Sequence, residues 1–185
     1  MVNAVGEKIK LNHGCRNRPI PGFKGMDIDA HEGVDFVGDV SDLSRFESGS
    51  VAEIYGSHVI EHISHVRTLD VLKEWARVLE PGGILYVAVP DFARVVELYN
   101  SDGPGESGVG LTDWMTNYLW GDQVYGTAYH HAGFDFPRLR KLLLSAGFSE
   151  ASRVVDFPIG DADDCSRKVS TFDGKPISLN VVAIR

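Results

Sequence analysis

Short apolar runs, separated by turn residues, alternate along the chain with segments of helical periodicity. Runs rich in β-branched and aromatic residues predict strands. One of them, ILYVAV, is almost unbroken apolar sequence, which is typical of a strand buried on both faces. The predicted strands are Lys8–Asn12, Phe23–Ile28, Val34–Gly38, Val51–Ser57, Ile84–Val89, Ala151–Phe157 and Ser178–Ile184.

Two segments place apolar residues on one helical face. Val66–Leu79 does so with Leu69, Leu72 and Leu79, and it is predicted to end at the Pro-Gly-Gly that follows Glu80. Phe136–Ala146 is the second predicted helix and is closed by Gly147. Strands alternating with helices predict an α/β sheet, mostly parallel, with helices on both faces.

Three segments fall outside this alternation. Residues 14–22 hold two prolines and two glycines, which predicts a loop, and residues 160–174 are polar and rich in Asp. Residues 100–130 begin Gly-rich and then become aromatic. This stretch is either an insertion that packs its aromatic side chains on the domain or a lid over the site, and its position favours the lid.

Composition limits the function. The 185 residues predict one domain, 1–185, and a net charge of −8 makes nucleic acid an unfavourable partner. No apolar run approaches the roughly 20 residues that span a bilayer, and the N-terminus lacks a signal peptide's apolar region. Two cysteines cannot build a disulfide framework or a cysteine-based zinc knuckle. We therefore expect a cytoplasmic protein without nucleic-acid or membrane partners, of undetermined oligomeric state.

In a parallel sheet, ligands bind outside the carboxyl ends of the strands. There the first predicted strand meets Gly14, and the second ends at Asp27 and Asp29. A strand, a glycine loop and an acid on the next strand form the layout that binds an adenosine-type cofactor. The spacing leaves no room for a full helix, so the first crossover must be abbreviated. Alternatively, Gly14 and Gly22 simply make turns.

The strings LNHGCRNRPIPGFKGMDID, VDFVGDVSDL, VAEIYGSHVIEHISH and LKEWARVLEPGGILYVAVPDF follow one another in residues 8–92. In this order they resemble the small class I S-adenosylmethionine-dependent methyltransferases, particularly the type 11 domains, and the resemblance resumes at HAGFDFPRLRKLLLSAGF. It implies a Rossmann-like, doubly wound, mostly parallel sheet with an abbreviated first helix and an antiparallel last strand. It also implies S-adenosylmethionine as cofactor and methyl transfer to O or N of a small-molecule or sugar-containing (glycan-type) acceptor.

The resemblance also implies a set of cofactor contacts. Gly14 would lie under the methionine portion, Asp27 would accept the ribose hydroxyls, and Asp39 would receive the adenine amino group. Ser57 and His58 would line the inner side of the cofactor. Asp39 could instead cap a turn. The full cofactor-binding set is Gly14, Cys15, Arg16, Asp27, Ile28, Asp39, Val40, Ser57 and His58.

Two residues are candidates for the general base. Asp91 follows a strand end where the acceptor would meet the methyl group, and His131 carries an imidazole that titrates near neutrality. His130 and His131 are adjacent, so in an extended segment at most one of them faces the site. The alternative for these histidines is a packing or capping role. Cys15 is open to two interpretations, a packing residue or a reactive thiol.

The chain departs from the family pattern at Arg16, where the family has glycine. A side chain disfavours positive φ and takes up room near the ligand. Arg16 could turn outward, neutralise the cofactor carboxylate, or block the pocket, and we favour the first two together. The third would leave a degenerate methyltransferase fold that acts as a binding or interaction module.

Two rival enzyme classes are less favoured. His58-x-x-Glu61-His62 matches an inverted zinc-peptidase motif, which needs both histidines on one long helix. Here the motif follows a strand and a turn, so apart from this alternative we expect no metal ion. A nicotinamide dehydrogenase is disfavoured because the loop lacks G-x-G-x-x-G.

Overall fold

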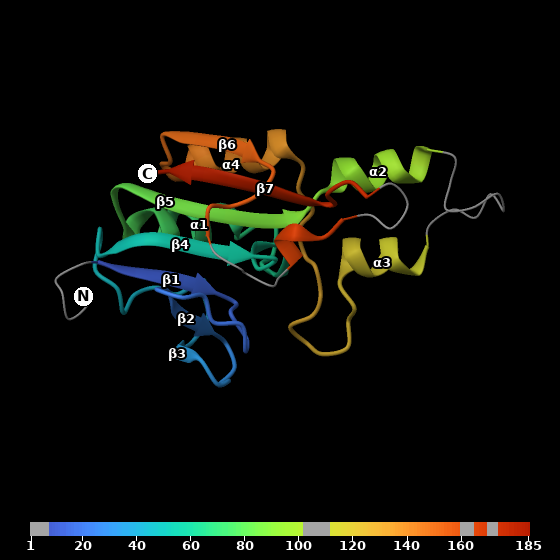
Figure 1. Cartoon of the computed structure of the whole chain (residues 1–185). Coiled ribbons are helices and arrows are strands. Elements are labelled where there is room, and N and C mark those ends of the chain that lie inside the picture. Colours follow the sequence, from blue (N-terminus) through green and yellow to red (C-terminus); the bar gives the residue numbers. More distant parts are fainter. Residues whose placement is uncertain (1–7, 102–111, 160–164, 170–173) are drawn as a thin grey trace.

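The computed structural model describes residues 8–101, 112–159, 165–169 and 174–185. Its centre is a seven-stranded sheet in the order β3-β2-β1-β4-β5-β7-β6 (Figure 1). The strands from β3 to β5 are parallel, and β7 is antiparallel to both β5 and β6. The predicted Rossmann-like, mostly parallel sheet with an antiparallel last strand is confirmed. The strands are β1 (Ile9–His13), β2 (Lys24–Asp27), β3 (Val34–Val37), β4 (Val51–Ser57), β5 (Leu79–Pro90), β6 (Glu150–Val154) and β7 (Ser178–Ile184).

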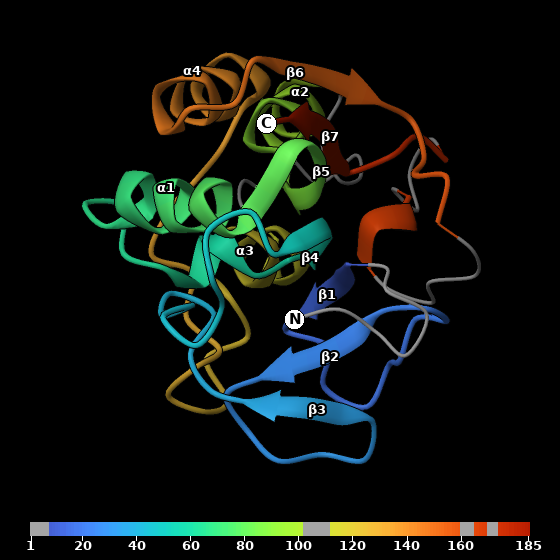
Figure 2. The ribbon, with the colours of Figure 1, turned by 90° about the vertical axis from the view of Figure 1, so that its left-hand side faces the viewer.

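Helices α1 (Thr68–Val78) and α4 (Phe136–Ala146) lie side by side on one face of the sheet (Figure 2). They bury Leu72 and Trp75 from α1 and Leu139 and Leu143 from α4 against the sheet. Gly147 ends α4 in the left-handed conformation with φ 105°, as its position predicts.

The expectation of helices on both faces is wrong for the described residues. The opposite face is covered by the β1–β2 loop, the segment after β6, and the short 3-10 helix η2 (Cys165–Arg167) (Figure 2). Ile20 from the loop and Phe157 from the segment pack with Tyr55 and Tyr86 of the sheet. The first crossover contains only turns, so its helix is absent rather than short.

Several boundaries differ from the sequence prediction. β5 begins at Leu79, before the Pro-Gly-Gly turn, because Leu79 already has an extended backbone and pairs with Val51 of β4. Two helices were not predicted. These are α2 (Phe92–Asn100) and α3 (Asp113–Trp120), and both lie beyond the carboxyl ends of the parallel strands (Figure 1).

Helices α2 and α3 share a small core of their own. Val95 and Leu98 of α2 pack with Met115 of α3 and with Ile177, which precedes β7. This core fixes α3 at the end of the sheet where ligands bind in such folds. Residues 102–111, which belong to the predicted lid, and most of the predicted Asp-rich stretch lie outside the described residues.

None of the described helices is long and apolar enough to cross a membrane. The single domain over residues 1–185 and the cytoplasmic location stay predictions.

Candidate active site

One large cavity opens at the carboxyl ends of the parallel strands and has a volume of about 1260 Å³. Every residue that the sequence proposed as a cofactor contact lines this cavity, and so does His131. The cofactor candidates lie at or just after the ends of β1, β2, β3 and β4, and His131 lies between α3 and α4, so chain segments far apart in sequence converge here. The cofactor candidates are Gly14, Cys15, Arg16, Asp27, Ile28, Asp39, Val40, Ser57 and His58.

The loop after β1 requires a glycine at position 14. Gly14 has φ 64°, and a Cβ there would lie 2.6 Å from Cγ2 of Val59. Its amide donates to the carbonyl of Met26 at 2.8 Å, which ties the loop to β2. The absence of a side chain at Gly14 therefore makes room for Val59 and also leaves space in the cavity that Gly14 lines.

Cys15 is a packing residue in this structure. It is 3% exposed, and its Sγ would lie only 2.7 Å from a Cβ built on Gly25. Burial, with the nearby Asp27 carboxylate, raises the pKa of the Cys15 thiol to about 11. The thiol form therefore dominates at neutral pH, which disfavours a nucleophilic role.

Arg16 has a left-handed backbone with φ 47°, a conformation that favours glycine. Its amide donates to Oδ2 of Asp27 at 2.8 Å, and the amide of Asp29 donates to Oδ1 at 3.1 Å. Each carboxylate oxygen retains a lone pair, so Asp27 can also accept two ribose hydroxyls. The Arg16 residue is exposed and lines the cavity without closing it, which argues against the blocked pocket.

The part of the cavity that is proposed to bind the adenine ring is formed by the residues after β3. Oδ1 of Asp39 accepts the amide of Ser41 at 2.8 Å, so the turn-capping role considered from the sequence is present. The Asp39 side chain lies at the cavity, beside buried Val40. Val40 is fixed by Nε1 of Trp75, which donates to its carbonyl at 2.8 Å.

The end of β4 supplies an unpaired polar atom. Oγ of Ser57 is buried and has no hydrogen-bond partner within the protein, although the residue lines the cavity. A buried polar atom without a partner is costly, and a bound ligand can supply the missing hydrogen bond. The carboxylate or amino group of S-adenosylmethionine fits this requirement.

His58 follows directly and has φ 55°. Its Nδ1 lies 3.1 Å from Oε1 of Glu61, and its Nε2 lies 2.9 Å from Oγ of Ser178. Residues Ile60–His62 form only one 3-10 turn, η1, and His58 lies before it. The helix that the inverted zinc-peptidase motif needs is therefore not formed, and both nitrogens of His58 face other partners.

The described part of the predicted lid forms a wall of the cavity. Trp114, Asn117 and Tyr118 of α3 line it, and so do most residues of 121–128. Burial raises the pKa of Tyr118, whose hydroxyl donates to the carbonyl of Ile177 at 2.6 Å. Closure of this wall over a ligand stays a prediction.

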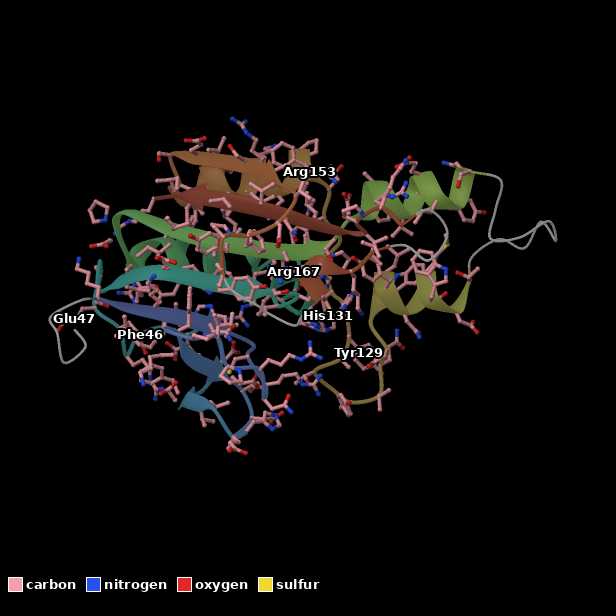
Figure 3. All side chains as sticks on the ribbon, viewed as in Figure 1. Phe46, Glu47, Tyr129, His131, Arg153 and Arg167 are labelled. Carbon is pink, nitrogen blue, oxygen red and sulfur yellow. The ribbon has the colours of Figure 1, made fainter. Side chains whose placement is uncertain are left out.

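His130 and His131 both line the cavity, so the expectation that at most one does is wrong. Residues 127–131 are not a regular strand. The backbone amide of His130 donates to the carbonyl of Trp120 and that of His131 to the carbonyl of Glu61, so the alternation of side chains along a strand does not apply here. Figure 3 shows His131 between the strand ends and α3, close to Tyr129.

Asp91 does not line the cavity. It is 2% exposed, its Oδ1 accepts the amide of Arg94 as the N-cap of α2, and its Oδ2 lies 2.7 Å from Nη2 of Arg153. Its carboxylate is thus committed to holding α2 and β6, and this placement does not support the predicted role as base.

Sequence reasoning missed several cavity residues. His13 precedes Gly14 and is 1% exposed, with its ring against Trp75 at 4.8 Å between centroids. Neither ring nitrogen has a hydrogen-bond partner, and burial lowers the pKa of His13 to about 3. Only its position before the glycine could have pointed to it. Tyr118 lay within the aromatic run but could not be distinguished from its neighbours.

Comparisons with known proteins agree with this geometry. A family described as "Methyltransferase domain" matches residues 24–87. A S-adenosylmethionine-dependent methyltransferase from Archaeoglobus fulgidus is similar in structure, with a TM-score of 0.59, 13% identity, and 96% of this chain and 86% of that chain covered. No curated protein sequence matches the chain.

Two further solved structures are similar at TM-scores of 0.56 and 0.55. The 1,6-didemethyltoxoflavin-N1-methyltransferase from Burkholderia thailandensis, solved with S-adenosylhomocysteine, is 18% identical, with 96% of this chain and 71% of that chain covered. A methyltransferase from Haloferax volcanii, solved in complex with the Trm112 activator, is 16% identical, with 96% and 81% covered.

At these identities the structural likeness establishes the fold, and the methyltransferase-domain match lies within it. The chain has the class I S-adenosylmethionine-dependent methyltransferase fold, as its sequence predicts. The methyltransferase-domain match over residues 24–87 supports S-adenosylmethionine-dependent methyltransferase activity, with S-adenosylmethionine as the cofactor.

Proposed function

We propose that the chain transfers the methyl group of S-adenosylmethionine to an oxygen or nitrogen atom of a small-molecule or glycan-type acceptor. The observation that carries this proposal is the convergence of all predicted cofactor contacts on one cavity. Its volume of about 1260 Å³ exceeds the range of about 300–1,000 Å³ that is usual for one ligand. The cavity therefore has room for a cofactor and an acceptor together.

The residues divide the cavity into two parts. Asp27, Asp39 and Ser57 would hold the ribose, adenine and methionine portions of the cofactor at the ends of the strands. The acceptor would occupy the side of the cavity that is walled by α3 and by residues 121–131. Tyr118 and His131 line this side. Methyl transfer needs alignment of the nucleophile with the sulfonium, exclusion of water and removal of one proton.

His131 is the proposed base. Its amide is fixed by the carbonyl of Glu61 at 2.7 Å, so the residue is held at the cavity while remaining exposed. An exposed imidazole can take a proton from the acceptor and pass it to solvent. Asp91 is held by an ion pair with Arg153, whereas within the described residues His131 forms no ion pair that would hold its side chain away from the cavity.

The test is turnover of methyl-labelled S-adenosylmethionine with a panel of phenols, amines and sugars. Turnover is measured as the formation of S-adenosylhomocysteine. We expect acceptor-dependent product from the wild type and at least about a hundredfold lower turnover from His131→Ala. S-adenosylmethionine affinity, measured on the same preparations, should be equal in both. Acceptor-dependent turnover that His131→Ala leaves unchanged would exclude this base, and cofactor binding without any turnover across the panel would favour a binding module.

A further inference from the structure

Three side chains from two distant segments meet beside the proposed acceptor side of the cavity. Glu61 and His62 belong to η1, and His130 ends the segment that follows α3. One donor atom from each of the three lies within 4.8 Å of the others. His62 and His130 also line the cavity, and their rings are 4.7 Å apart between centroids.

Glu61 is the least satisfied member of this group. Its residue is 0% exposed, and neither carboxylate oxygen accepts a well-aligned hydrogen bond. Nδ1 of His58 approaches Oε1 to 3.1 Å, close enough for an ion pair but without hydrogen-bond alignment. A buried carboxylate in this condition is costly unless a cation compensates it.

The two histidines are oriented as metal ligands usually are. Nδ1 of His62 lies 3.0 Å from the carbonyl of Tyr129, and Nδ1 of His130 lies 3.1 Å from the carbonyl of Tyr118. A carbonyl only accepts, so each Nδ1 carries the proton and each Nε2 keeps a free lone pair. A ring N–H that donates to a backbone carbonyl is the usual outer contact of a metal-bound histidine.

From these contacts we infer that Glu61, His62 and His130 bind a divalent first-row transition metal ion. One carboxylate and two imidazoles form a ligand set that leaves coordination positions open. A zinc ion at about 2.1 Å from each donor would bring the donors to about 3.5 Å from one another, a contraction that side-chain rotations supply. This set replaces the sequence alternative of His58 with His62, because His58 pairs with Ser178.

The site deepens the proposed function and rests on it for its role. Because His62 and His130 line the cavity, the open positions of the ion would face the acceptor. A metal ion lowers the pKa of a bound hydroxyl and orients it. The acceptor class favoured by this arrangement is therefore one that presents a hydroxyl oxygen.

The experiment is a calorimetric titration of EDTA-treated, dialysed protein with Zn²⁺, repeated with Co²⁺ to record visible absorption bands from bound cobalt. The wild type should bind one ion. His62→Ala and His130→Asn should each weaken binding at least tenfold. In His130→Asn the side-chain amide can still donate to the carbonyl of Tyr118, but it offers no atom in place of Nε2. If His130 had only a structural role, this variant would therefore bind Zn²⁺ as the wild type does.

His31→Ala is the matched control, because His31 lies near Asp27 and Asp29 in a second, more exposed group of metal-type donors. It should bind Zn²⁺ within twofold of the wild type. Absence of binding to the wild type, or binding that His31→Ala abolishes and His130→Asn retains, would overturn the inference. S-adenosylmethionine titrated into the same EDTA-treated protein tests the proposed function separately: cofactor binding without Zn²⁺ binding refutes only the metal site.

Discussion

The backbone amide of Arg16 donates a hydrogen bond of 2.8 Å to Oδ2 of Asp27. This bond fixes the loop after β1 to the acid at the end of β2. The backbone of the unusual arginine thus supports the residue proposed to bind ribose. Arg16 combines a left-handed backbone with a flexible cationic side chain, and the residue lines the cavity.

Two aspartates three positions apart allow a matched test of the adenine end. Asp39 and Asp42 both accept the amide two residues later, at 2.8 and 3.0 Å, but of the two only Asp39 lines the large cavity. We expect Asp39→Ala to weaken S-adenosylmethionine binding at least fivefold in calorimetry, about the loss of one hydrogen bond. Asp42→Ala should bind as the wild type does. Equal affinity of both variants would exclude Asp39 from the cofactor site.

Gly14 and Gly22 form a second matched pair. Both have positive φ, but a Cβ on Gly22 meets nothing within 4 Å, whereas a Cβ on Gly14 meets Val59 at 2.6 Å. Gly22→Ala should cost about 1 kcal/mol from backbone strain, and Gly14→Ala about 1–3 kcal/mol more from overpacking. Urea unfolding measures both. Equal losses would show that Val59 moves aside, and Gly14→Ala combined with Val59→Ala tests that directly.

His13 predicts a pH dependence of stability. Its pKa falls from 6.5 to about 3 on burial, so the unfolded chain binds a proton between these values and the folded chain does not. The contribution of His13 to the free energy of unfolding is therefore fully present above pH 6.5. It is lost as the pH falls toward 3, by about 1.4 kcal/mol per pH unit. Burial also lowers the pKa of His130, which acts in the same direction.

The measurement is urea unfolding of the wild type and His13→Phe between pH 7 and 5. Phenylalanine keeps a ring against Trp75 and does not titrate. The free energy of unfolding should fall less steeply with pH in the variant. Parallel curves would mean that His13 is protonated in the folded protein.

The two cysteines should react differently with thiol reagents. Cys15 is buried and its pKa is raised to about 11, whereas Cys165 is partly exposed. At pH 8, Ellman's reagent should therefore modify Cys165 rapidly in the native protein and Cys15 only after unfolding. Rapid native modification of two thiols would contradict the packing role of Cys15. The variant Cys165→Ser isolates the slow thiol.

The sequence predicts most strands and the residues at their carboxyl ends, because β-branched runs and glycine turns act locally. Val51–Ser57, Phe136–Ala146 and Ser178–Ile184 have the same bounds in the structure. Local patterns could not show that Asp91 would be used as a helix cap and an ion-pair partner. Its partner Arg153 lies 62 positions away, and that contact is set by the packing of the fold.

The same limitation applies to the histidines. His62 stands in a recognisable motif, but its approach to His130 depends on how the segment after α3 returns to η1. The sequence also could not show that α1 and α4 would lie on the same face of the sheet. Sequence periodicity identifies a buried face of each helix, whereas Ile20 and Phe157 cover the other face of the sheet from irregular segments.

The most direct test of cofactor binding is calorimetric titration of the wild-type chain with S-adenosylmethionine, alongside Asp27→Ala and Arg16→Gly. We predict one site in the wild type and affinity at least tenfold weaker in Asp27→Ala. The affinity of Arg16→Gly should lie within about tenfold of the wild type, which is the contribution of one charge-assisted bond. No binding by the wild type together with clear binding by Arg16→Gly would contradict the proposed cofactor site, because the guanidinium would then fill the cavity.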